Sequence, residues 1–254
     1  MASSVKQKRV ETRPWVYLSP HLDDVALSVG GLVWTQCTTG TAVEVWTICA
    51  GDVPSGPLSP FAQSLHERWG TGRDAVARRR AEDENACRIL GARPVYLDIP
   101  DCIYRRAASG EPFYPQGGDI FGDLHPGERA LVEHLADLLA ARLPANAVLV
   151  VPLTLGGHVD HQLTRAAAER LGGPLWYYAD YPYVLWQTED FSAGLSAQVF
   201  PLSPEAVTAW QNAVAAYRSQ LSTFWADEIE MRAAIAAYAR QQGGVALYRM
   251  EHSF

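Results

Sequence analysis

The feature that most constrains the fold of this chain is an alternation of short apolar runs with longer helix-like stretches. The apolar runs cover residues 15–18, 41–49, 95–97, 147–151 and 175–178. Runs this short that are rich in β-branched and aromatic residues are typical of buried strands. Strands that alternate with helices predict an α/β fold, here a Rossmann-like, doubly wound and largely parallel sheet with helices on both faces.

The segments between these runs predict helices and two long loops. Helices are expected at about 24–38, 73–90, 127–143, 158–171, 203–221 and 227–242, with further strands near 197–201 and 245–249. Residues 51–72, which contain several Gly and Pro, and residues 101–126 are expected to be loops. Loops of this length in a compact domain are often binding loops or lids.

Composition limits the class of protein. The chain has 254 residues and a formal charge of −7, so we expect one domain over 14–254 after a flexible tail over 1–13, and no binding to nucleic acid. The polar N-terminus does not resemble a signal peptide, and no apolar run is long enough to span a bilayer, so a cytoplasmic protein is expected. Four cysteines without a C-x-x-C pair are expected to be buried, reduced thiols.

Two motifs that contain His and Asp follow two of the expected strands. Ser19-Pro20-His21-Leu22-Asp23-Asp24 follows the first strand, and Gly156-Gly157-His158-Val159-Asp160-His161 follows the strand at 147–151. In an open α/β sheet, ligands bind outside the carboxyl ends of the strands. Because zinc takes imidazole nitrogen and carboxylate oxygen as ligands, the two motifs together predict one shared metal site.

The residue types suggest a division of roles within this site. His21, one Asp of the first motif and one His of the second would supply three metal ligands and leave a fourth position for water. The other Asp could take a proton from the activated water, and the other His could face the oxyanion or donate to a leaving amine. Asp160 could fix the tautomer of one of the imidazoles. Each motif alone also fits a helix cap or a solvated helix start, but both motifs at strand ends favour a functional site.

Taken together, the two motifs resemble those of the LmbE / PIG-L family of zinc-dependent de-N-acetylases. That family has a Pro-His-Pro-Asp-Asp-Glu motif near its N-terminus and a later motif like His-Pro-Asp-His, and the resemblance spans roughly residues 14–172. It implies a metal-dependent hydrolase that removes an N-acetyl or related acyl group from a small amino sugar or glycoconjugate. In this chain Leu22, Val25 and Val159 replace the usual Pro, Glu and Pro, but no proposed ligand position is lost.

The resemblance also implies roles for single residues. The implied metal ligands are His21, Asp24 and His161. Asp23 would be the general base, and His158 would stabilise the oxyanion, with Asp160 orienting it. Zinc is the implied cofactor, although such a site also accepts Fe²⁺, Co²⁺ or Mn²⁺.

A third stretch extends the resemblance to two further residues. Arg79-Arg80-Ala81-Glu82 matches a helix of the family, and Asp101 matches an Asp in the loop after the third strand. In relatives such an Arg and Asp contact the substrate, so Arg79 and Asp101 are candidates for substrate binding. An ordinary helix ion pair and a turn Asp are the competing interpretations.

Several questions stay open at the level of sequence. The aromatic segment 176–186 could stack on a sugar, although such clusters are more often core or a subunit contact, and a homo-oligomer stays open. His66 and His125 lie in the expected loops and need no function. The alternative functions are a metal-dependent hydrolase of another amide or ester and a non-catalytic protein that binds through the metal site. The turn after the first strand has no G-x-G-x-x-G, which disfavours a dinucleotide-binding enzyme.

Overall fold

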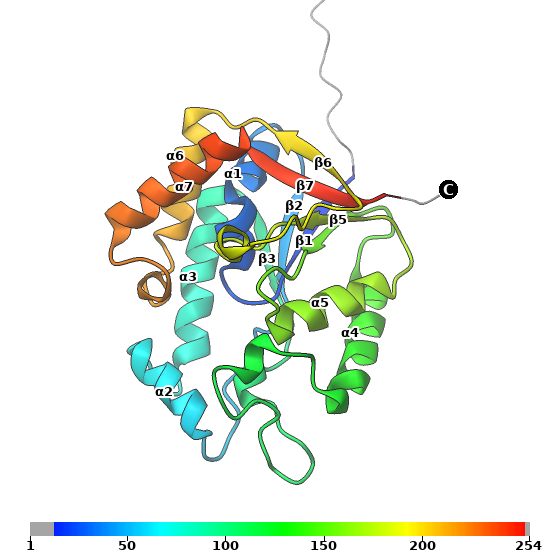
Figure 1. The fold of residues 1–254 in the computed structure, drawn as a ribbon, viewed down its shortest axis with the longest axis vertical. Coiled ribbons are helices and arrows are strands. Elements are labelled where there is room, and N and C mark those ends of the chain that lie inside the picture. The colour runs from blue at the N-terminus through cyan, green and yellow to red at the C-terminus, as the bar shows by residue number, and fades with distance from the viewer. Residues whose placement is uncertain (1–12, 252–254) are drawn as a thin grey trace, which may run out of the picture.

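The structure of the protein is a computed structural model that describes residues 13–251 (Figure 1). Its centre is a seven-stranded sheet in the order β3-β2-β1-β4-β5-β7-β6. The strands are β1 (Trp15–Ser19), β2 (Val43–Thr47), β3 (Arg93–Tyr96), β4 (Val148–Pro152), β5 (Leu175–Tyr178), β6 (Leu195–Phe200) and β7 (Val245–Met250). The expected tail over 1–13 lies, apart from Arg13, outside the described residues.

The first five strands are all parallel, and only β7 runs against its two neighbours, β5 and β6. From β1 the chain builds outward to β2 and β3 on one side and later to β4 and β5 on the other. The order of strands therefore reverses between β1 and β4, which is the place where open α/β sheets bind ligands. The α/β, largely parallel sheet expected from the sequence is confirmed.

Helices cover both faces of the sheet, as Figure 1 shows. One face carries α1 (Asp24–Thr38), α3 (Ala75–Leu90), α6 (Pro204–Val214) and α7 (Glu228–Gln242), and the other carries α4 (Arg129–Arg142) and α5 (Val159–Glu169). Alternate residues of β1 divide between these layers: Tyr17 packs in the core under α1, whereas Val16 and Leu18 pack in the core under α4 and α5. A strand buried on both faces explains why its sequence is uniformly apolar.

Some local expectations are wrong. Residues 51–72 are not all loop, because α2 (Pro60–Arg68) forms there, with the Ser59 hydroxyl accepting a hydrogen bond from the Ala62 amide. Residues 101–126 contain two short 3-10 helices, Cys102–Tyr104 and Asp119–Phe121. The helix expected to reach about residue 221 ends at Val214, although its predicted N-cap, Ser203, is confirmed. No helix within residues 13–251 is long and apolar enough to cross a membrane.

Candidate active site

The turn after β1 presents the two carboxylates of the first motif to the site. Asp23 occupies the N-cap position of α1, yet its side chain makes no capping hydrogen bond. The Ser19 hydroxyl instead accepts the Val25 amide (3.2 Å) and donates to the His21 carbonyl (2.6 Å), which fixes the turn. Because Ser19 supplies the polar contacts at this helix start, the carboxylate of Asp23 is left for the cavity that it lines.

The second motif begins α5. His158 is its N-cap residue, and the Nδ1 atom of the ring accepts a hydrogen bond from the Asp160 amide (3.2 Å). The turn before it needs glycine: Gly156 has a φ of 88°, and a Cβ there would lie 2.7 Å from the ring of Tyr183. His161 follows His158 on the first turn, so both imidazoles face the carboxyl end of the sheet.

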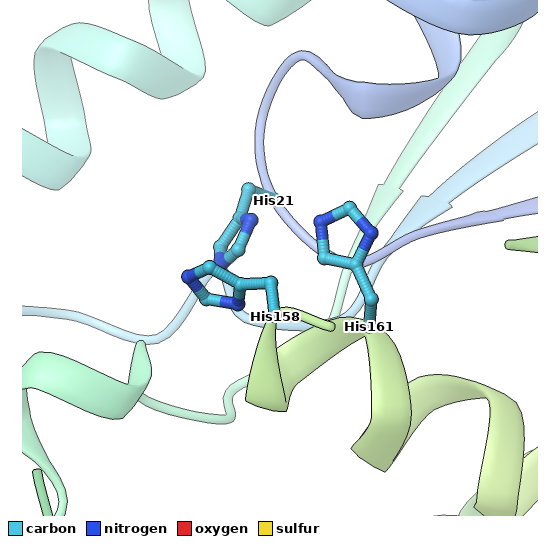
Figure 2. Close-up of side chains that lie close together, drawn as sticks. All are labelled: His21, His158 and His161. Atoms are coloured by element: carbon cyan, nitrogen blue, oxygen red, sulfur yellow. The ribbon is translucent and has the colours of Figure 1, made fainter. Parts of the chain in front are cut away.

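Figure 2 shows that three histidines meet between the loop after β1 and the start of α5. His21, His158 and His161 each place one ring nitrogen within 4.8 Å of the others. The Asp24 carboxylate joins the two motifs, since its oxygens lie 3.2 Å from Nδ1 of His21 and 3.3 Å from Nε2 of His161. The structure therefore brings the three expected ligands, His21, Asp24 and His161, to one place.

The far nitrogens of two of these histidines contact buried carboxylates. Nε2 of His21 lies 2.9 Å from Oδ2 of Asp160, and Nδ1 of His161 lies 2.6 Å from Oδ1 of Asp180. A histidine that binds a metal almost always donates its other N–H to a carboxylate or a carbonyl, which holds the ring in place. This pairing leaves Nδ1 of His21 and Nε2 of His161 facing Asp24, so the donor set fits a divalent metal such as zinc.

Asp180 is a site residue that the sequence interpretation missed. It follows β5, and its second oxygen accepts a hydrogen bond from the Leu155 amide (2.9 Å), which ties it to the loop before α5. The available signal was an Asp shortly after the fifth predicted strand, at 175–178. No other metal-binding residue type stands close to it in the sequence.

The expected pairing of Asp160 with the imidazole of His158 is wrong. Oδ2 of Asp160 takes its hydrogen bonds from the His21 ring and from the Cys102 amide (3.0 Å), while Oδ1 binds the guanidinium of Arg105. The reason is local: His158, as N-cap, turns its ring over the free amides of α5, and the side chain of Asp160 lies against the loop after β3. The hydrogen bond from Asp160 to His158 comes from its backbone N–H, while a carboxylate oxygen of Asp160 lies within 4.8 Å of a His158 ring nitrogen.

Burial and charge shift the protonation of the site. Burial raises the pKa of Asp23 to about 6, with a further contribution from the Asp24 carboxylate and opposition from Arg79. For Asp24, burial acts upward, but the facing His161 and His21 outweigh it and hold the pKa well below the usual value. Burial acts to lower the pKa of His161, yet Asp24 and Asp180 raise it to about 10.

The buried carboxylates around the histidines outnumber the buried guanidiniums. The carboxylates are Asp23, Asp24, Asp101, Asp160 and Asp180, and the guanidiniums are Arg79 and Arg105. Without a metal, the protonated imidazoles of His21 and His161, whose pKa values the facing carboxylates raise against the effect of burial, supply the compensating charge. A divalent metal bound to the neutral imidazoles would supply the same positive charge.

A cavity of about 370 Å³ opens over these groups. Its lining includes His21, Asp23, Asp24, Arg79, Asp101 and His158, together with apolar residues of the surrounding loops. His161 lies directly beneath, 1% exposed. Most of the residues that the sequence singled out thus share one cavity.

Arg79 and Asp101 face each other at this cavity. Arg79 is 8% exposed, and its guanidinium lies 3.8 Å from Asp23 and 3.9 Å from Asp101 and stacks over the ring of Trp69. Its Nε has no hydrogen-bond partner among the described residues. Asp101 uses Oδ1 to cap the 3-10 helix at Cys102–Tyr104, which leaves Oδ2 toward the site. Neither residue is part of an ion pair within its own helix.

The remaining residues of interest divide between core and site. Trp176, Tyr177 and Tyr178 belong to β5 and pack in the cores, whereas Tyr183 and Trp186 line the cavity. His66 is buried in α2 and bonds the Tyr104 hydroxyl (2.6 Å), and His125 caps the 3-10 helix Pro126–Glu128. The cysteines at 37, 49, 87 and 102 are free thiols, and all but Cys37 are buried.

The chain is similar to known deacetylases. Residues 16–171 match the family described as PIG-L, GlcNAc-PI de-N-acetylase. The 2'-N-acetylparomamine deacetylase of Niallia circulans is 30% identical over 241 residues, which are 87% of this chain and 86% of that protein.

Two solved structures of deacetylases are similar over nearly the whole chain. Teicoplanin deacetylase in a zinc-inhibited form is 27% identical with a TM-score of 0.79, over 94% of this chain and 98% of that one. The deacetylase of the A40926 pseudoaglycone is 30% identical with a TM-score of 0.70, over 94% and 96% of the two chains. The chain belongs to the PIG-L (LmbE-like) family of de-N-acetylases.

Proposed function

We propose that this chain is a zinc-dependent deacetylase that hydrolyses the N-acetyl group of an amino sugar in a small glycoconjugate. The observation that carries the proposal is the position of Asp24 between His21 and His161, each of which is held from behind by a buried carboxylate. The similar deacetylases are named for 2'-N-acetylparomamine and for teicoplanin. An amide of an amino sugar is the chemistry that these substrates share.

His21, Asp24 and His161 would hold the metal. Zinc, when bound, polarises the amide carbonyl and lowers the pKa of water. Asp160 and Asp180 keep the two ligand imidazoles in the orientation and tautomer that binding requires.

Asp23 is placed to move the proton. Its carboxylate lines the cavity next to Asp24, makes no helix-capping bond, and lies 3.8 Å from the Arg79 guanidinium. It would accept a proton from the water that attacks the acetyl carbon. As the C–N bond breaks, Asp23 would deliver this proton to the leaving amine, so that the products are acetate and the free amino sugar.

His158 is placed to stabilise the oxyanion. Because its Nδ1 accepts the Asp160 amide hydrogen, the ring of a neutral His158 carries its proton on Nε2. That N–H can donate to the carbonyl oxygen as negative charge develops there. The loss of one such donor typically lowers turnover by about 10²–10³.

The test combines metal content with turnover in three proteins: wild type, His161→Ala and Asp23→Asn. We expect near-stoichiometric zinc in wild type and in Asp23→Asn, and loss of the metal in His161→Ala. Wild type should release acetate from a panel of N-acetylated amino sugars, and Asp23→Asn should be slower by about 10²–10⁴, the usual contribution of a general base.

Elemental analysis and acetate release separate the two parts of the proposal. Loss of zinc in Asp23→Asn would contradict the assignment of Asp23 as the base. Zinc-loaded wild type that releases no acetate from any N-acetyl amino sugar would contradict the deacetylase function and favour a protein that only binds.

A further inference from the structure

Exposed aromatic side chains gather at the mouth of the catalytic cavity. Phe121 is 47% exposed and Trp186 is 60% exposed, and both line the cavity. They come from two loops far apart in the sequence, at the 3-10 helices Asp119–Phe121 and Tyr183–Trp186. Large apolar side chains that remain in water and converge on one opening are characteristic of a binding surface.

These rings form a continuous path from solvent to the catalytic histidines. The ring of Tyr183 has its centroid 5.4 Å from that of Trp186 and 6.1 Å from that of Phe121. Further in, Phe121 lies 5.5 Å from the ring of His158, and Tyr183 lies 6.0 Å from the ring of His161. All these separations fall in the range of direct aromatic contact. A group attached to a substrate at the site could therefore contact these rings.

The negatively and positively charged side chains that line the cavity lie at different depths. The carboxylates, which belong to Asp23, Asp24 and Asp101, are buried. Among the described lining residues, the exposed charged one is Arg68, at the end of α2. The mouth is therefore mainly apolar, with one positive charge and the hydroxyl of Thr223, and its described lining offers no exposed carboxylate to a positively charged group.

The size of the cavity decides where the rest of the substrate lies. At about 370 Å³ it is near the lower end of ordinary ligand pockets. With the acetamide at the histidines, the sugar occupies the inner part of this cavity, and a substituent on the sugar extends toward the aromatic residues of the mouth.

We propose that Phe121, Tyr183 and Trp186 form a subsite for an uncharged aromatic or alkyl group attached to the amino sugar. The chain accordingly prefers an N-acetyl amino sugar with an apolar aglycone to a polycationic aminoglycoside, although a paromamine deacetylase is among its relatives. This inference rests on the proposed deacetylase function and specifies its substrate class.

The test compares kcat/KM of the zinc-loaded protein for N-acetylglucosamine, its phenyl and octyl glycosides, and 2'-N-acetylparomamine. We expect the phenyl and octyl glycosides to exceed the free sugar by about tenfold or more, mainly through KM, because a flat apolar group gains ring contacts at the mouth. 2'-N-Acetylparomamine should fall below both glycosides.

Variants assign this preference to the subsite. Trp186→Ala should reduce the ratio of phenyl glycoside to free sugar to within about threefold of one, and Trp186→Phe should retain most of it. Ile229→Ala is the matched control, since Ile229 is an apolar residue that is 79% exposed on α7 and does not line the cavity. It should leave the ratio unchanged.

Binding of phenyl N-acetylglucosaminide to Asp23→Asn, measured by calorimetry, gives a readout that needs no turnover. Equal kcat/KM for free sugar and glycosides, preference for 2'-N-acetylparomamine, or an unchanged ratio in Trp186→Ala would overturn the subsite while leaving the deacetylase function in place. If the phenyl glycoside binds more tightly than the free sugar but zinc-loaded wild type releases no acetate from any of these substrates, the subsite is supported and the deacetylase function is rejected.

Discussion

Arg105 lies buried behind the candidate metal site and joins it to a second acidic residue. Its guanidinium binds Asp160 on one side and both carboxylate oxygens of Glu128 on the other, and Tyr114 donates to the same carboxylate (2.6 Å). Since Asp160 in turn holds His21, we expect Arg105 to be a positioning residue for that metal ligand. Such outer partners are worth about 10–100-fold in metal affinity.

Arg105→Gln should therefore weaken zinc binding by about 10–100-fold, measured by competition with a chelator of known affinity. Arg105→Lys should recover part of the loss, because it keeps the charge but not the forked geometry. Glu128→Gln is the control: it weakens the far side of the network and should lower stability while it changes zinc affinity by less than about threefold. Unchanged zinc affinity in a folded Arg105→Gln would contradict the positioning role.

For single residues of the site, the sequence indicates those that belong to motifs and misses those that stand alone in the chain. His21, Asp24 and His161 could be proposed as one site because each lies in a dense His/Asp cluster after a strand. Asp180 could not, because its role depends on β5 lying next to β4, which is a fact of topology. The partner of Asp160 was predicted wrongly for a similar reason, since loop packing rather than spacing decides which imidazole it meets.

Among the elements, α3 is tied to its neighbours through a buried carboxyl group. The oxygens of Asp83 accept hydrogen bonds from Tyr217, after α6, and from Tyr96, at the end of β3 (2.7 and 2.9 Å). Burial raises the pKa of Asp83, against those hydrogen bonds and Arg79. The folded protein thus holds this proton more tightly than the unfolded chain does. Its stabilising contribution is complete below about pH 4 and is lost as the pH rises through the folded pKa.

Asp83→Asn should remove this dependence. We expect the free energy of unfolding of wild type to fall relative to that of Asp83→Asn between pH 4 and 7, measured by urea denaturation at each pH. Asp190→Asn gives a control of opposite sign, because hydrogen bonds from Ser192 lower the pKa of Asp190. There, wild type should gain on the variant as pH rises. A difference for Asp83→Asn that does not change with pH would refute the expectation.

The helix α2, which the sequence interpretation missed, begins with a recognisable helix-start pair. Ser59-Pro60 at the start of α2 is the same N-cap and Pro pair as Ser203-Pro204, which located the start of α6. The Gly and Pro residues on either side of α2 outweighed that signal. The buried face of α2 also differs from that of the other helices, since Ala62 and Leu65 pack with the 3-10 helix Cys102–Tyr104 rather than against the sheet.

For the whole molecule, the site lies where the two halves of the sheet meet. His21 and Asp24 come from the connection between β1 and α1, and His161 comes from α5 on the opposite face. Alternation of strands and helices predicts the parallel part of this arrangement. It does not predict that β7 inserts between β5 and β6, because an antiparallel edge is decided by how the C-terminal helices return the chain to the sheet. The site depends on the parallel part alone.

A metal held by ligands from both faces should stabilise the whole fold. A ligand that binds only the folded state adds about 2.7 kcal/mol at a free concentration of 100 times Kd. For a chain of this size, that free energy corresponds to a rise in Tm of roughly 5–10 °C. We therefore expect zinc to raise the Tm of the metal-free protein by this amount in differential scanning calorimetry.

The variants show whether the rise in Tm comes from this site. His161→Ala should lose the rise, because one ligand from α5 is gone and the two faces are no longer joined. Trp186→Ala, which changes the mouth of the cavity but no ligand, should keep it. An equal rise in His161→Ala and wild type would mean that zinc binds elsewhere, and the junction of β1 and β4 would then not be the metal site.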